Sequence, residues 1–224
     1  MSLDRPLRVG LMVPANNSTM EGELLAWLPP GSTCQTLRIA RGAAMLNADT
    51  LPAYRAAALD LAKSFDSDAL DVIVYGCTAA GFIAGPAADT AIGSAIAECT
   101  GLPTITTAQA MVRTLSRHAV KRVALVTPYL DAVNDRLAAF LEAYDIEVAS
   151  LSSFKAKNVD ELAAIGSAQV AERTRIALQT DCDAVFVACS QLPTLEVVRA
   201  LSVSAAKPLF SSIQVSALLA REIQ

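Results

Sequence analysis

The chain has 224 residues, enough for one large domain or two smaller ones, and 53% of them are hydrophobic, which excludes an intrinsically disordered protein. The net charge is −4 and Lys and Arg form no cluster, so the composition disfavours nucleic-acid binding. No apolar run approaches the ~20 residues that cross a bilayer and no signal peptide is evident, so we expect a cytoplasmic protein without a membrane partner.

The first half of the chain predicts strands that alternate with helices. An apolar run at residues 7–13 predicts a strand, and the polar segment after it predicts a helix start with Asn17 or Ser18 as its cap. The pattern continues with a strand at 32–39, a loop at 41–49, a helix at 52–63, a strand at 70–75, a helix at 84–100, a strand at 104–106 and a helix at 107–115.

The second half predicts the same order of elements. Its apolar and amphipathic segments predict a strand from residue 121, a helix at 131–144, a strand at 146–151, a loop at 154–158, a helix at 159–179, a strand before Cys189, a helix near 195–201, a strand after Pro208 and a helix at 216–222. Alternating strands and helices are typical of parallel βαβ units.

Three strand ends recur in the same order, at offsets of 114, 112 and 105 residues, which indicates an internal duplication. The sequence therefore predicts an α/β fold of two pseudo-symmetric lobes, each a four-stranded parallel sheet flanked by helices. We expect one lobe to comprise residues 1–112 plus 212–224 and the other residues 113–211. The carboxyl ends of the two sheets would then face each other across a cleft that holds the active site.

Two cysteines occupy equivalent positions in the repeat. Cys77 precedes Thr78 and Cys189 precedes Ser190, and each cysteine directly follows a predicted buried strand. The two thiols would meet across the cleft. The five cysteines form no CxxC pair and His118 is the only histidine, so the sequence argues against a disulfide framework and predicts no metal site.

Two thiols on opposite sides of a small substrate support two kinds of chemistry. One thiolate could remove a proton while the other thiol delivers one, or one thiolate could add to an activated alkene. Polar groups that could hold carboxylates follow the strands at Asn17, Tyr129, Thr78, Ser190 and Gln191. No Arg or Lys lies beside either cysteine, so we expect amides, hydroxyls and helix starts to bind the anion.

Four segments resemble the aspartate/glutamate racemase superfamily, and within it the branch of maleate cis-trans isomerases and arylmalonate decarboxylases. They are Val13–Glu21, Gly76–Gly81, Val126–Tyr129 with Val133 and Asn134, and Ala188–Leu195. The racemases typically carry Cys-Asn-Thr-Ala at the first thiol and a histidine after the second, and the decarboxylases lack the first cysteine. Both cysteines are present here, and Cys189-Ser-Gln-Leu-Pro193 matches the isomerase pattern best.

The resemblance implies that Cys77 adds to the double bond of maleate and that Cys189 donates and accepts the proton, giving fumarate without a metal or cofactor. It implies that a small dicarboxylate is held by a set of polar side chains and backbone amides: Asn17, Thr78, Ala79, Tyr129, Asn158, Ser190 and Gln191. A homodimer is usual for this fold.

Other functions stay open from the residues alone. Ala79 and Ala80 stand where relatives often have serine, which leaves the substrate undecided. The alternatives are a two-thiol racemase of amino acids or hydantoins, a malonate-type decarboxylase, and a dicarboxylate-binding protein without catalytic activity.

Overall fold

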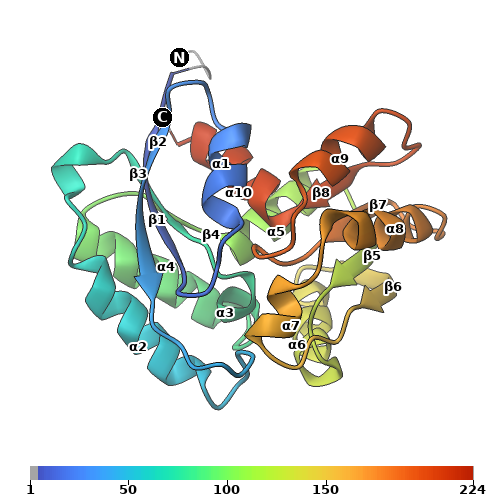
Figure 1. Ribbon diagram of the computed structural model, residues 1–224, viewed down its shortest axis with the longest axis horizontal. Helices are drawn as coiled ribbons and strands as arrows, with labels where there is room; N and C mark the ends of the chain where they lie inside the picture. Colours follow the sequence, from blue (N-terminus) through green and yellow to red (C-terminus); the bar gives the residue numbers. More distant parts are fainter. Residues whose placement is uncertain (1–4, 224) are drawn as a thin grey trace.

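The computed structural model describes residues 5–223; residues 1–4 and 224 of the predicted first lobe lie outside the described residues. Figure 1 shows two lobes side by side. The first half contains β1 (Arg8–Pro14), α1 (Met20–Trp27), β2 (Thr33–Ile39), α2 (Leu51–Ala62), the 3₁₀ turn η1 (Ser67–Ala69), β3 (Val72–Tyr75), α3 (Thr78–Phe82), α4 (Pro86–Thr100), β4 (Thr104–Thr106) and α5 (Thr107–Arg117). The second contains β5 (Arg122–Thr127), α6 (Asp131–Glu142), β6 (Glu147–Ser153), α7 (Val159–Ala163), α8 (Ser167–Ala177), β7 (Ala184–Val187), α9 (Leu195–Ser202), β8 (Leu209–Ser211) and α10 (Ser212–Arg221).

The two sheets have the same topology. Their strand orders are β2-β1-β3-β4 and β6-β5-β7-β8, and all neighbouring strands pair in parallel. The third strand of each half, β3 and β7, is buried along its whole length, as the short continuous apolar runs predict. The predicted fold class, with two four-stranded parallel sheets, is therefore confirmed.

An aspartate at the start of the third strand has the same role in both lobes. Asp71 accepts a hydrogen bond from the backbone N–H of Arg8 at 2.8 Å, and Asp183 accepts from those of Lys121 and Arg122, both at 2.8 Å. The side chain of Arg8 lowers the pKa of Asp71, and the two backbone N–H groups lower that of Asp183. Each carboxylate thus joins the starts of two neighbouring strands.

The last helix of the second half packs on the first half. α10 lies against α1 and α5, and Figure 1 shows it beside α1. The helices α5 and α10 begin alike, because the Thr106 hydroxyl accepts from Gln109 N–H at 3.0 Å and the Ser211 hydroxyl from Gln214 N–H at 3.3 Å. The internal duplication therefore includes the helix caps as well as the strands.

Three predicted helices differ from those in the structure. The closing helix predicted at 216–222 begins four residues earlier, at Ser212 of α10. The helical segment predicted at 84–100 is preceded by a separate helix, α3, and Gly85 adopts a φ of +84° between α3 and α4. The single helix predicted at 159–179 is broken, because α8 begins anew after Gly166, whose N–H donates to the Gln169 side chain at 2.9 Å. Among residues 5–223 no helix is long and apolar enough to cross a bilayer.

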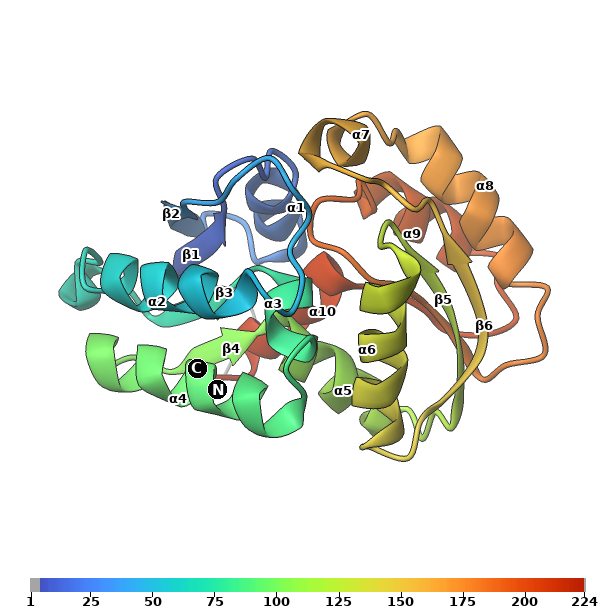
Figure 2. The same cartoon turned by 90° about the horizontal axis from the view of Figure 1, so that it is seen from below.

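The short helix α3 carries Cys77 at its N-cap and is buried throughout. Figure 2 shows it at the junction of the two lobes, close to α6. A Cβ atom on Gly81 would lie 2.5 Å from the Cβ of Ala108 on α5 and 2.8 Å from a carboxylate oxygen of Asp89 on α4. Only glycine at this position lets α3 pack so closely against its neighbours.

Gly81→Ala should lower the free energy of unfolding by about 1–3 kcal/mol, because the added methyl group overpacks the α3–α5 contact. Gly22→Ala is the matched control, since a Cβ on this exposed helical glycine meets nothing within 4 Å. It should stabilise the protein by about 0.5–1 kcal/mol. Urea unfolding measures both variants, and equal effects would contradict the packing argument.

Candidate active site

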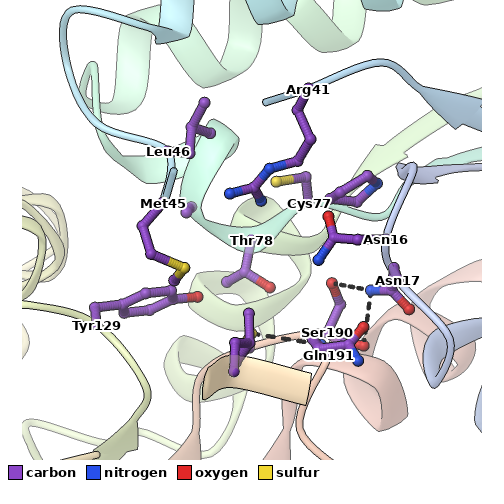
Figure 3. Close-up of a pocket in the computed structure, with 14 residues that line it drawn as sticks. Asn16, Asn17, Arg41, Met45, Leu46, Cys77, Thr78, Tyr129, Ser190 and Gln191 are labelled. Carbon is purple, nitrogen blue, oxygen red and sulfur yellow. Dashed lines mark hydrogen bonds between the residues drawn. The ribbon is translucent and has the colours of Figure 1, made fainter. Parts of the chain in front are cut away.

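A small cavity lies between the lobes at the carboxyl ends of β1, β3, β5 and β7, and both Cys77 and Cys189 line it (Figure 3). Its volume is about 30 Å³. That is room for two or three water molecules at ~10–15 Å³ each. The other lining residues are Pro14, Asn16, Asn17, Arg41, Met45, Leu46, Thr78, Ala79, Tyr129, Leu162, Ser190 and Gln191. No cluster of metal-binding side chains occurs within residues 5–223.

Cys77 lies where β3 ends and α3 begins, and 5% of it is exposed. Burial raises the pKa of its thiol, since a thiolate loses solvation there. The backbone N–H groups of Ala80 and Ala79 at the start of α3 and the guanidinium of Arg41 act in the opposite direction. The thiolate of Cys77 therefore has donors and a cation directed at it.

Cys189 occupies the equivalent position after β7. Burial raises the pKa of its thiol to about 11, although the Gln191 N–H donates to its sulfur at 3.4 Å and the Tyr129 hydroxyl also favours the thiolate. A negative charge on Cys77 also contributes to this increase. Cys189 thus holds its proton at neutral pH and is suited to donate it.

Three buried polar atoms in the cavity have no hydrogen-bond partner among the described residues. They are Oδ1 of Asn16, the hydroxyl of Thr78 and the hydroxyl of Tyr129. Buried polar atoms are normally paired. These groups are therefore available to a polar ligand, and Figure 3 shows them around the space beside Cys77.

Three residues join the lobes at the base of the cavity, and we call them the clasp: Asn17, Gly76 and Ser190. The Asn17 amide donates to the backbone oxygen and the hydroxyl of Ser190, at 3.1 and 3.3 Å. The Ser190 hydroxyl donates to the Gly76 carbonyl at 2.6 Å. The Asn17 side-chain oxygen accepts from the backbone N–H groups of Thr19 and Met20. Both ends of the Asn17 amide are thus engaged.

Gln191 extends this contact. Its side-chain oxygen accepts from the backbone N–H of Ser18 at 3.1 Å, and its side-chain nitrogen donates to the Ser18 hydroxyl at 3.2 Å. Ser190 and Gln191 lie in a turn and not at a helix start as predicted, because α9 begins only at Leu195. Asn17, Ser190 and Gln191 thus lie at the cavity as the sequence predicts, with side chains that hold the lobes together.

The site also contains a cation, although no Arg or Lys lies beside either cysteine in the sequence. Arg41, from the loop between β2 and α2, lines the cavity, and Figure 3 shows its guanidinium directed toward Cys77. One guanidinium nitrogen donates to the Ala44 carbonyl at 2.6 Å, which fixes the side chain. Arg41 and Asn16 are the polar lining residues that the sequence reasoning missed, and no spacing relative to the cysteines could have identified Arg41.

Asn158 lies at the edge of the site. Its side-chain oxygen caps α7 by accepting from the N–H groups of Asp160 and Glu161, at 3.1 and 2.9 Å, and it is not among the residues that line the cavity. Its backbone forms an isolated bridge with Ala44 of the β2–α2 loop. The predicted contact of Asn158 with a carboxylate stays a prediction.

Ser190→Ala should lower the free energy of unfolding by about 1–3 kcal/mol, because it leaves the Gly76 carbonyl without its donor in the clasp. Ser18→Ala is the control, since Ser18 belongs to the same contact between the lobes but is exposed. Urea unfolding should show little change for it. A loss for Ser18→Ala as large as that for Ser190→Ala would contradict this role of the clasp.

Comparison with known proteins identifies the family. The family model described as arylmalonate decarboxylase matches residues 9–220. The chain is 29% identical to the maleate isomerase of Nocardia farcinica over 199 residues, which are 85% of this chain and 79% of that protein. It is 30% identical to the arylmalonate decarboxylase of Bordetella bronchiseptica over 156 residues, 69% of this chain and 65% of that protein.

A solved structure is also similar over nearly the whole chain. It is a cysteine-to-serine variant of the Nocardia farcinica maleate cis-trans isomerase with a covalently bound succinylcysteine intermediate. The TM-score is 0.88 with 27% sequence identity, and the match covers 98% of this chain and 93% of that one. The fold, the cavity with its two thiols and the sequence matches all indicate the same family. The chain is an enzyme of the arylmalonate decarboxylase and maleate isomerase family.

Proposed function

We propose that this enzyme isomerises maleate to fumarate, with Cys77 as the nucleophile and Cys189 as the proton donor and acceptor. The observation that carries the proposal is that two buried thiols, from equivalent strand ends of the two lobes, line one small cavity. A decarboxylation or a simple binding site needs no second thiol. An addition and elimination at one carbon, with proton transfer at its neighbour, uses both.

The polar groups of the cavity fit a substrate with two carboxylates. The unpartnered hydroxyls of Thr78 and Tyr129 would donate hydrogen bonds to the carboxylate whose neighbouring carbon is protonated. Arg41 would neutralise part of the charge on the second carboxylate, on the side of Cys77. A guanidinium forms strong hydrogen bonds with a carboxylate, because these bonds are charge-assisted.

The reaction needs only two reversible steps. The Cys77 thiolate forms a bond to one alkene carbon, and the π electrons move into the carboxylate attached to the other carbon. That other carbon then takes the proton of Cys189. The carbon–carbon bond is then single and rotates. Cys189 takes back the proton, the double bond forms again in the trans geometry, and Cys77 leaves as a thiolate.

The cavity as it stands is too small for maleate, which has eight heavy atoms. The clasp holds the lobes together at the base, so the cavity would enlarge by movement of the β2–α2 loop, which carries Arg41, Met45 and Leu46. Its return over the substrate would bring Arg41 to the carboxylate and exclude water.

A second candidate function is decarboxylation of an arylmalonate. The observation that favours it is the apolar wall formed by Met45, Leu46 and Leu162, which could take an aromatic ring. Phenylmalonate and maleate distinguish the two functions. Release of carbon dioxide from phenylmalonate with no change in maleate would identify the decarboxylase.

Cys77→Ser should abolish formation of fumarate from maleate, by at least about a thousandfold in kcat, because the hydroxyl is a far weaker nucleophile at neutral pH. Cys189→Ser should also lose turnover but retain the nucleophile, so intact mass spectrometry should find the chain heavier by one maleic acid. Full activity of either variant would refute the assignment. Cys99→Ser, at an exposed cysteine, is the control and should behave like the wild type.

Arg41→Gln should raise the KM for maleate by about 10- to 100-fold, because it removes a charged hydrogen bond to the substrate. Arg41→Lys should recover part of this loss by restoring the charge. Steady-state kinetics on maleate measure both. An unchanged KM in Arg41→Gln would mean that the guanidinium does not contact the substrate.

A further inference from the structure

The two thiols are held in the fold by different means. Cys77 leads directly into α3, and the Gly81 N–H donates to the Cys77 carbonyl at 3.3 Å, so its own lobe fixes its position. Cys189 is followed by a turn instead, and the next helix, α9, begins only at Leu195. The turn of residues 189–194, which we call the thiol turn, therefore depends on other contacts to hold its position.

At the end of the thiol turn, Thr194 is bound by a residue of the other lobe. The carboxylate of Glu23 on α1 accepts hydrogen bonds from the Thr194 backbone N–H and from the Thr194 hydroxyl, each at 2.8 Å. Thr194 is fully buried, and its hydroxyl oxygen also lies 3.0 Å from that of Ser211. Both oxygens of one carboxylate thus hold a single residue across the boundary between the lobes.

Glu23 also takes the place of a helix cap. Thr194 is the N-cap residue of α9, but its own side chain does not cap the helix. Burial raises the pKa of Glu23, while the N–H groups of Leu195 and Thr194 and the Thr194 hydroxyl act in the opposite direction. A carboxylate at a helix N-terminus is stabilised by the free N–H groups there. Removal of this carboxylate would therefore free both the start of α9 and the turn before it.

We propose that Glu23 is a positioning residue for Cys189, and that its two hydrogen bonds to Thr194 fix the thiol turn that places the Cys189 sulfur in the cavity. The proposal rests on the proposed role of Cys189 as proton donor and acceptor, but not on maleate being the substrate. Proton transfer needs a short and aligned contact, and a displacement of about 1 Å can lower a rate about a hundredfold. Cys77 would keep its position, because α3 holds it from its own lobe.

The first test is the steady-state kinetics of maleate isomerisation by the full chain. Glu23→Ala should lower kcat about 10- to 100-fold and leave KM within about twofold, because the groups proposed to bind the carboxylates are not on the thiol turn. Glu23→Gln should recover most of kcat, since its side-chain amide can still pair with the Thr194 N–H and hydroxyl. A loss in Glu23→Ala that appears only in KM would overturn the proposal.

Arg199→Ala is the matched control. The Arg199 guanidinium joins the same two helices, α9 and α1, by donating to the Ala26 carbonyl at 3.1 Å, but it lies farther along α9 from Cys189. This variant should keep the wild-type kcat and KM, because it removes a contact between the lobes without releasing the thiol turn.

The second test requires no turnover. Peptide mass spectrometry compares the alkylation of Cys189 by iodoacetamide with that of Cys77 in the same molecules. Burial raises the pKa of Cys189 to about 11, so a released turn should expose the thiol and lower this pKa toward its ordinary value. The ratio of Cys189 to Cys77 alkylation should rise at least about threefold in Glu23→Ala, which corresponds to about half a pKa unit. It should stay at the wild-type value in Arg199→Ala.

An unchanged ratio in folded Glu23→Ala would overturn the proposal, and so would an equal rise in Arg199→Ala. If Glu23→Ala does not fold, Thr194→Val replaces it, because this change removes only the hydroxyl contact and keeps the shape of the side chain. The ratio should rise in that variant too, and no change would again overturn the proposal. A wild-type protein that leaves maleate unconverted would refute the proposed function alone, since the alkylation ratio would still decide the role of Glu23.

Discussion

One hydrogen bond, from the Ser190 hydroxyl to the Gly76 carbonyl, sets the geometry of the active site. It joins the residue after one thiol to the residue before the other, and its length of 2.6 Å leaves little freedom between them. Asn17 holds Ser190 from a third strand end, so β1, β3 and β7 converge at one point. The β2–α2 loop, which carries Arg41, Met45 and Leu46, forms another part of the cavity wall.

The second constraint is electrostatic. Two thiols and a dianionic ligand in one buried cavity would place several negative charges close together, in a protein whose net charge is already −4. Burial raises the pKa values of Cys77 and Cys189, which limits the negative charge of the site at rest. The guanidinium of Arg41 and the backbone N–H groups at the start of α3 act against this increase at Cys77.

The duplicated strand ends made the fold predictable, because a parallel sheet places the carboxyl ends of its strands at one edge. That argument brought Cys77 and Cys189 to one cavity without any knowledge of distances. It could not identify Arg41, whose position depends on the path of a loop, nor distinguish Asn16 from Asn17, because adjacent side chains point in different directions.

The placement of α10 has a consequence for biosynthesis. This helix lies in the second half of the sequence, yet it packs against α1 and α5 of the first half, and most of its residues are buried there. On the ribosome, the amino-terminal lobe must therefore wait for residues 212–221 to emerge before its core is complete. A nascent chain that ends between Cys77 and Cys189 has only one of the two thiols. Its active site is therefore completed at the same stage of synthesis as its fold.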